Sequence, residues 1–283
     1  MKKEEHWDII LKPSADWFDL KLAEVWKYKD LIYMFVKRDF VSQYKQTILG
    51  PLWFIIQPIF TTLTYMIVFG KIANLSTDNQ PKILFYMSGI LFWNYFSTSF
   101  VRTSETFAAN AGIFGKVYFP RLTVPIASVC SSFISFFIQF ALLIVILLMY
   151  VMNGFVFHWS LTILLLPVLI FIMALQALGL GIIISSMTTK YRDLKHLVTF
   201  GIQLLMYATP VVYPLSMVTD VRLQFLLKIN PMTAVIETFR YALLGSGSFS
   251  WEALSYSIIV SCIIVLTGIA IFNKVERDFM DTI

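Results

Sequence analysis

Long stretches without a charged side chain are the feature that most constrains this sequence. No Asp, Glu, Lys or Arg occurs in residues 49–70, 83–101, 122–187, 198–219 or 253–273. A helix that crosses a membrane needs about 20 mostly apolar residues, and each of these stretches has that length. Charged residues make up 14% of the chain, against about 25% in a typical soluble domain. The sequence therefore predicts an all-α polytopic membrane protein.

The third of these stretches has 66 residues, which is too long for a single crossing. Asn153-Gly154 interrupts it near the middle and His158-Trp159 follows, a pattern typical of a short turn at a membrane surface. We therefore expect six transmembrane helices, at about residues 51–70, 83–101, 125–151, 160–186, 197–213 and 252–273. They form one transmembrane domain, residues 49–283, which follows a cytoplasmic N-terminal arm, residues 1–48.

Lys and Arg residues are distributed unevenly between the two sides of the membrane that this arrangement creates. Of the 22 in the chain, 17 fall on the side of the N-terminus. Because loops rich in Lys and Arg stay in the cytoplasm, both termini are expected there. On the opposite side, residues 214–251 are largely apolar, but Pro231 divides them into pieces too short to cross. We expect two short re-entrant helices within about residues 214–245, with a simple surface cap as the alternative.

The predicted spans lack the side chains that several classes of membrane protein require. Ionisable groups inside spans mark proton relays and ion sites, and essentially none occur here. His6, His158 and His196 match no metal-ligand spacing, and no phosphate-binding G-x-x-x-x-G-K-[ST] loop is present. We therefore expect no catalytic residue, no metal and no cofactor in this chain. Any ATP would have to be used by a separate partner.

Uncharged polar side chains recur at helical spacing inside the predicted spans. They are Gln57, Thr61 and Thr64 in the first span, and Asn94, Ser97 and Thr98 in the second. Such rows of polar side chains either form hydrogen bonds between helices or line a hydrated passage suited to a hydroxyl-rich cargo. Aromatic residues near the span ends, among them Trp53, Tyr207 and Tyr213, are typical of interfacial anchors, or offer flat faces for sugar rings.

The segment before the first span alternates apolar and basic residues from 17 to 45. This pattern predicts an amphipathic helix in the inner-leaflet interface. Arg38 and Lys45 lie next to the span, where they would meet an anionic head group, with simple anchoring as the alternative. We expect Gly50-Pro51 to let the chain turn into the bilayer and Pro58 to loosen the first span, with a static kink absorbed by packing as the alternative for Pro58. Basic residues beside the spans account for the pI near 9.1, so no nucleic-acid partner is expected.

The segment RTSETFAANAGIFGKVYFPR, residues 102–121, is of helical size but too polar to enter lipid. It predicts a short cytoplasmic helix at about 103–115 that docks on a soluble partner, with an ordinary surface loop as the alternative.

Four segments, taken in order, resemble a known family. They are YKQTILGPLWFIIQP entering the first span, KVYFPRLTVP before the third, YRDL before the fifth, and the Pro-split segment before the sixth. Their order and spacing are similar to the permease subunit of bacterial ABC-2 type polysaccharide exporters, which transport O-antigen, capsule and teichoic acid. The similarity extends from about Leu31 to Ile283.

The resemblance implies a homodimer in the bacterial inner (plasma) membrane that recruits two copies of a separate ABC ATPase, which binds ATP and Mg²⁺. The implied cargo is a polysaccharide on an undecaprenyl-diphosphate lipid, moved from the cytoplasmic side outward. Membrane lipids are further implied partners.

The resemblance also implies roles for particular residues. The segment at about 103–115 becomes a coupling helix, whose contacts with the ATPase are Glu105, Phe107, Asn110 and Phe114. The lipid diphosphate is guided to a gate between spans one and five by Arg38, Tyr44, Lys45, Trp53, Gln57 and Thr61. The candidates that line the channel are Thr64, Asn94, Ser97, Thr98, Tyr207 and Tyr213.

Three other functions stay open from the sequence: a permease for drugs or smaller lipids, a membrane-bound glycolipid enzyme, and a scaffold without transport activity. The enzyme needs acidic residues gathered at a membrane-facing site. The cytoplasmic acids Asp30, Asp39, Glu105, Asp193, Glu276 and Asp278 are instead scattered, without a D-x-D.

Overall fold

In this computed structural model the described residues are 22–45, 47–157, 160–191 and 193–280. The first part of the predicted arm, residues 1–21, lies outside them. The described residues form helices and connecting turns, without a strand. The α-helices are α1 (Leu22–Lys27), α2 (Lys29–Tyr44), α3 (Trp53–Tyr65), α4 (Lys82–Ser104), α5 (Thr106–Phe114), α6 (Thr123–Met152), α7 (Leu166–Thr188), α8 (Leu194–Tyr207), α9 (Val221–Ile229), α10 (Pro231–Leu244) and α11 (Trp251–Met280).

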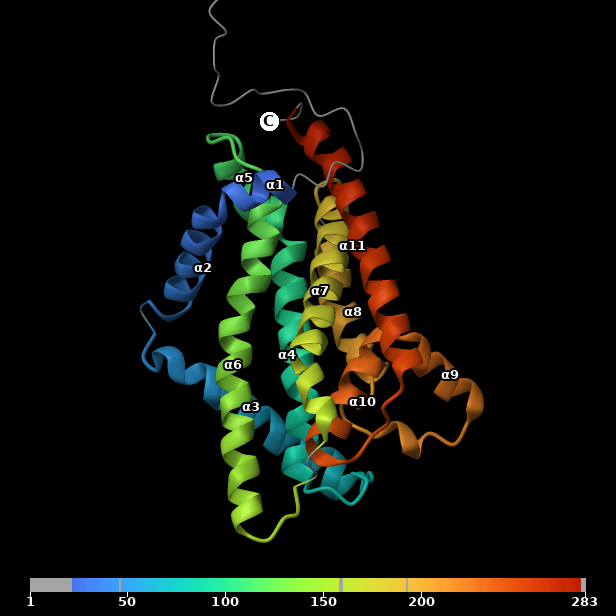
Figure 1. Cartoon of the computed structure of the whole chain (residues 1–283). Helices are drawn as coiled ribbons and strands as arrows, with labels where there is room; N and C mark the ends of the chain where they lie inside the picture. The colour runs from blue at the N-terminus through green and yellow to red at the C-terminus, as the bar shows by residue number, and fades with distance from the viewer. Residues whose placement is uncertain (1–21, 46, 158–159, 192, 281–283) are drawn as a thin grey trace, which may run out of the picture.

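The helices α4, α6, α7 and α11 run side by side along the long axis of the molecule (Figure 1). Helices α1 and α5 and the end of α11 lie at one end of this bundle, and the turn between α6 and α7 lies at the other. Helix α4 is central, packing chiefly against α6 and α7, and 15 of its 23 residues are buried. Its aromatic side chains hold the core together: Phe92 packs against Phe136 of α6 and Phe239 of α10 at centroid distances of 5.4 and 4.7 Å.

Four helical segments of the described chain are long and apolar enough to cross a membrane. They are Gly50–Ile72, Thr123–Met152, Leu161–Thr188 and Trp251–Val275. These correspond to the first, third, fourth and sixth predicted spans. The second and fifth fall on α4 and α8, which do not meet that criterion. The charge-free part of α4 contains uncharged polar residues, among them Asn94, Ser97 and Thr98, and the 14 residues of α8 reach only about 21 Å at 1.5 Å per residue.

Two predicted boundaries are wrong. The fifth span was expected to reach residue 213, but α8 ends at Tyr207 and the chain turns through 208–213. Pro210 has no N–H to donate, and its carbonyl and that of Val211 accept short hydrogen bonds from a side chain of α10 instead. The coupling helix was expected from about 103, but α4 continues to Ser104 and α5 begins at Thr106.

The predicted division at Pro231 is confirmed, since it separates α9 from α10. Proline suits the first turn of a helix, where its missing N–H has no intrahelical partner. The Asn230 side chain caps α10 by accepting a hydrogen bond of 3.0 Å from the backbone N–H of Met232. Gly245 ends the helix in the left-handed conformation, with φ 70°.

Candidate functional site

Helix α3 presents one uncovered face of polar and aromatic side chains. Trp53, Gln57 and Thr64 are exposed and Thr61 is half-buried, and their spacing places all four on the same side of the helix. The hydroxyls of Thr61 and Thr64 donate to the carbonyls four residues earlier, at 2.9 and 2.8 Å. The indole of Trp53 and the amide of Gln57 are the groups that this face offers to a neighbour.

Helix α8 presents a second uncovered face, and it meets α3 at one end. Leu197, Phe200, Leu204 and Tyr207 are each 52–60% exposed and follow one another at helical spacing. The Tyr65 hydroxyl of α3 lies 3.2 Å from the Met206 sulfur of α8. The Tyr213 hydroxyl donates to the carbonyl of Tyr207 at 2.9 Å, so these two predicted residues are brought together.

The polar residues predicted on the second span lie partly inside the bundle. Asn94 donates to the Gln139 side chain of α6 at 3.2 Å, which is the helix-to-helix hydrogen bond that the sequence left as an alternative. Ser97 donates to the Asn94 carbonyl at 3.3 Å, and Thr98 is half-buried. In the single chain Asn94 therefore connects α4 to α6 rather than contributing to the face on α3.

The predicted head-group residues of the arm lie on and just after α2, which packs against α6. The Nε and Nη2 atoms of Arg38 donate hydrogen bonds to Asp39 Oδ1, at 2.9 and 2.8 Å. The guanidinium lies over the Phe35 ring, 4.6 Å from its centroid. Lys45 is exposed, and the side chain of Tyr44 lies outside the described residues.

A cavity of about 300 Å³ joins Arg38 to a second cation that the sequence analysis missed. Arg102 at the end of α4 lines it, and its guanidinium donates to the Ser131 hydroxyl at 3.2 Å. Glu105 and Asp39 line it too, so the cavity carries charges of both signs. The sequence signal for Arg102 was its position at the end of a predicted span, next to the polar segment.

Helix α5 is anchored by most of the residues predicted to contact a partner. Phe107 is 1% exposed and stacks on Phe272 of α11 at 4.6 Å, while Phe114 is 4% exposed and meets Phe107 edge to face. Asn110 is buried and donates to the Thr106 carbonyl at 3.0 Å.

Glu105, beside this anchor, is the predicted contact that remains partly exposed. Its carboxylate pairs with Lys195 of α8 at 2.6 Å, where the two side chains are 34% and 61% exposed. The pair borders a cavity of about 380 Å³ with Phe107, Thr188 and Thr189. The most exposed large side chains nearby are Val117 and Tyr118, at 60% and 61%.

A buried network of charged residues lies at the end of the bundle opposite α5, and the sequence analysis did not predict it. Arg240 is fully buried and donates to the carbonyls of Pro210 at 2.6 Å and Val211 at 2.5 Å, with a longer contact of 3.4 Å to Tyr213. Its guanidinium lies over the Phe85 ring at 3.8 Å. Glu237, one helical turn earlier, is 3% exposed and 3.8 Å from Arg240.

Burial and the opposite charge of the partner act in opposite directions on each member of this pair. Burial raises the pKa of the Glu237 carboxyl, and the Arg240 guanidinium opposes that rise. Burial also lowers the pKa of Arg240 to about 10, so the side chain keeps its charge at neutral pH. The sequence signal was an opposite-charge pair at i and i+3 within an otherwise apolar helix, a spacing that places both on one face.

Comparison with known proteins gives concordant matches. Residues 30–244 match the ABC-2 type transporter family. The chain is 28% identical over 253 residues to the O-antigen export system permease protein RfbA of Klebsiella pneumoniae, covering 89% of this chain and 94% of that protein. It is 27% identical over 263 residues to the protein of the same name from Myxococcus xanthus, covering 93% and 98%. It is 22% identical over 254 residues to the polysialic acid transport protein KpsM of Escherichia coli, covering 86% and 92%.

The family match spans more than half of the chain and includes α3, α8 and the buried pair of α10. Together with the four apolar helical segments, it identifies a multi-pass membrane protein. This chain belongs to the ABC-2 type transporter family.

Proposed function

We propose that this protein is the transmembrane subunit of an ATP-driven exporter that moves undecaprenyl-diphosphate-linked polysaccharide out of the cytoplasm of a bacterium. Relatives named for O-antigen export and polysialic acid transport, which align over nearly their whole length, support the cargo class. The observation that carries the transport role is the pair of uncovered faces on α3 and α8, joined at Tyr65 and Met206.

A passage requires more than one copy of the chain. In the single chain α3 buries only Pro58 and Thr62 and α8 buries only Met206, so both helices have room for a partner. A two-fold copy would set the same two faces opposite one another. Trp53, Gln57 and Tyr207 then line a passage with aromatic and amide groups suited to sugar hydroxyls. In this arrangement α4 and α8 complete six spans, and α9 and α10 form short re-entrant helices that return to the same side.

The energy comes from ATP hydrolysis by a separate ABC ATPase in the cytoplasm, which contacts the permease at α5. The side chains available for direct contact are those that α5 and the following turn expose. These are Ala108 and Ala109 on the helix, followed by Lys116, Val117 and Tyr118. Phe107 and Phe114 have a different role, because they anchor α5 to Phe272 and Phe119. A push on the exposed surface is thereby passed to α11 and to the arm.

The lipid diphosphate approaches on the same side as α5. Arg38 and Arg102 supply two cations to one cavity, and Lys45 lies further along the arm. Phosphates favour arginine because the guanidinium presents several donors in a fixed plane. Asp39 holds Arg38 when the cargo is absent, so the phosphate has to displace or share that contact.

Co-purification from the native host tests this proposal. The tagged chain in mild detergent should bring down a separate ATPase in a fixed ratio and show ATPase activity. Combining Tyr118→Ala with Val117→Asp should abolish co-purification of the ATPase while the permease stays folded. Tyr150→Ala, at the other end of α6, is the matched control and should retain it. A chain that purifies without an ATPase in every detergent and supports no surface polysaccharide would overturn the assignment.

A further inference from the structure

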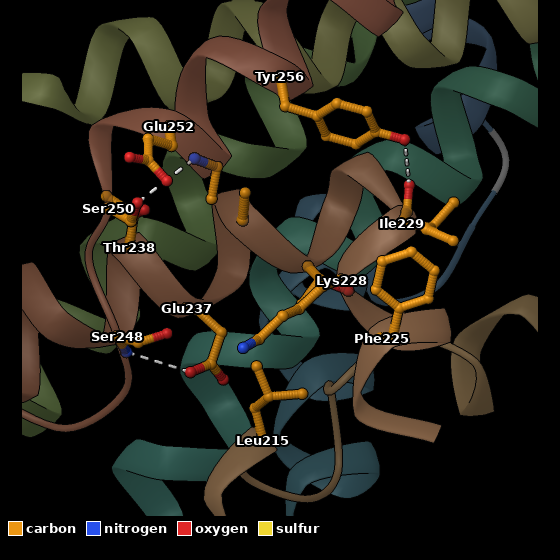
Figure 2. A pocket seen from close by; sticks show the side chains of 13 residues that line it. Leu215, Phe225, Lys228, Ile229, Glu237, Thr238, Ser248, Ser250, Glu252 and Tyr256 are labelled. Atoms are coloured by element: carbon orange, nitrogen blue, oxygen red, sulfur yellow. Dashed lines mark hydrogen bonds between the residues drawn. The ribbon is translucent and has the colours of Figure 1, made fainter. Parts of the chain in front are cut away.

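A cavity of about 540 Å³ lies between α9, α10 and the first turns of α11 (Figure 2). Phe225, Ile229 and Leu215 provide apolar walls. Tyr256 closes one side, and its hydroxyl donates to the Ile229 carbonyl at 2.9 Å. Neither the faces of α3 and α8 nor the α5 surface contributes a side chain to this cavity, so the proposed transport route does not account for it.

Three charged side chains from three helices line the cavity: Lys228, Glu237 and Glu252. In Figure 2 the Lys228 ammonium extends toward the Glu237 carboxylate. Glu237 is 3% exposed, and its Oε2 accepts a hydrogen bond of 3.2 Å from the Ser248 N–H. Its Oε1 has no hydrogen-bond partner among the described residues, although Arg240 Nη1 lies 3.8 Å away. A buried carboxylate oxygen in that state is costly, which points to a ligand that donates hydrogen bonds.

The charges select the kind of ligand. A simple anion would be attracted by Lys228 but repelled by the two carboxylates. A simple cation would be attracted by the carboxylates but repelled by Lys228. A neutral ligand would leave Lys228 and Glu252 without a counter-charge, whereas Glu237 already has one in Arg240. A ligand that carries an anion and a cation a few ångströms apart gives Lys228 and Glu252 each a counter-charge, and an ammonium with N–H groups donates hydrogen bonds to a carboxylate.

The surroundings of the cavity are those of an interfacial site. Helix α9 projects from the bundle and packs mainly against α10 (Figure 1). Leu223, Phe225 and Leu226 on it are 54–64% exposed, and Trp251 at the start of α11 is 64% exposed. Exposed apolar residues with Trp and Lys at one level of a membrane protein mark the boundary between acyl chains and head groups.

A second, mostly apolar groove of about 360 Å³ adjoins this cavity, and both include Ile229. Leu205, Leu226, Met232 and Ile264 are among the residues that line it. It extends along α7, α8 and α11 on the other side of the turn between α9 and α10, where there is room for a hydrocarbon chain.

We propose that this cavity binds the head group of a glycerophospholipid with a primary ammonium, such as phosphatidylethanolamine. Lys228 binds the phosphate, Glu252 binds the ammonium, and an acyl chain follows the apolar groove. The inference concerns a lipid bound to the protein and does not depend on what the protein exports.

The test compares three lipids with the same acyl chains on the purified full-length protein. Phosphatidylethanolamine, phosphatidylcholine and phosphatidylglycerol are added separately to delipidated protein, and retained lipid is counted by native mass spectrometry. Phosphatidylcholine has a positive charge but no N–H, and phosphatidylglycerol has no cation. Phosphatidylethanolamine should be retained about fivefold more than either, as expected for a partly exposed pair of charge contacts.

Two variants at exposed positions connect this preference to the cavity. Lys228→Gln and Glu252→Gln should each reduce retention of phosphatidylethanolamine to the level of phosphatidylcholine. Lys71→Gln changes an exposed lysine outside the cavity and should preserve the preference. Equal retention of the three lipids, or a preference unchanged in both variants, would overturn the proposal. So would stronger retention of phosphatidylglycerol, or thermal stabilisation by a soluble oligosaccharide that both variants lose, which would make this a sugar site.

Discussion

Two ion pairs, one at each end of the bundle, show how differently this protein uses charge. The pair of Arg240 and Glu237 is buried, with side chains 1% and 4% exposed, and Arg240 also binds backbone carbonyls of the turn after α8. The pair of Lys195 and Glu105 is closer, at 2.6 Å, yet its side chains are 61% and 34% exposed. Distance alone would rank the second pair as the stronger.

Burial reverses that ranking. Water screens the exposed pair, so that it contributes little to stability and leaves its partners free to move. Removing one member of the buried pair leaves polar groups without water or a partner. We infer that the end with Arg240 is held in one arrangement, whereas the end with Glu105 is free to respond to a partner.

The largest effect is expected from Arg240→Met. This change removes the donors to two carbonyls and leaves Glu237 as an uncompensated buried charge, which typically costs about 3–5 kcal/mol. The unfolding midpoint in detergent, measured by fluorescence, should fall sharply. Arg240→Lys should rescue little, because an ammonium cannot reproduce the planar fork that reaches both carbonyls. An unchanged midpoint in both variants would show that the network does not hold the fold.

Gly89→Ala is expected to have the next largest effect. A Cβ at this position would lie 2.6 Å from the Val211 carbonyl oxygen and 2.7 Å from the Arg240 guanidinium. Overpacking of this kind costs about 1–3 kcal/mol. Gly112→Ala on α5 is the matched control, since nothing lies within 4 Å of its added Cβ and alanine favours the helix. If the two variants have the same midpoint, the close approach at Gly89 is not constraining.

Glu105→Gln should change stability by less than about 1 kcal/mol, because the pair is largely exposed. A double-mutant cycle with Lys195→Gln in detergent measures this coupling. In cells the same variants should reduce export of surface polysaccharide if this end transmits the motion of the ATPase. A coupling larger than that of Arg240 and Glu237 would contradict the ranking by burial.

The smallest effect on stability is expected from Arg38→Ala, whose side chain is 44% exposed and bound to its neighbour Asp39. The variant should insert into the membrane and melt like the parent, yet surface polysaccharide should decrease because the cavity shared with Arg102 loses a cation. Lys37→Ala, at the adjacent exposed position, is the control. Normal surface polysaccharide in the Arg38 variant would refute the role in guiding the diphosphate.

The sequence by itself determined the class of protein and most of its helices. Stretches without charge fix where a chain can lie in lipid, since this depends only on local composition, and Pro231 and Asn153-Gly154 mark breaks through their own backbone chemistry. For the same reason, the first, third, fourth and sixth predicted spans coincide with the four apolar segments. The order of short motifs was also sufficient to indicate the ABC-2 family.

Tertiary structure decided which of the polar residues face outward and which bind inside. Spacing placed Phe107, Asn110 and Phe114 on one short helix, but it could not show that all three are buried, with Phe107 against α11. The end of α8 at Tyr207 depends on Arg240, which is 33 positions further along the chain. Likewise Lys228, Glu237 and Glu252 line one cavity only because three separate helices converge. Contacts between side chains distant in sequence depend on how the helices pack, and local helix propensity does not determine them.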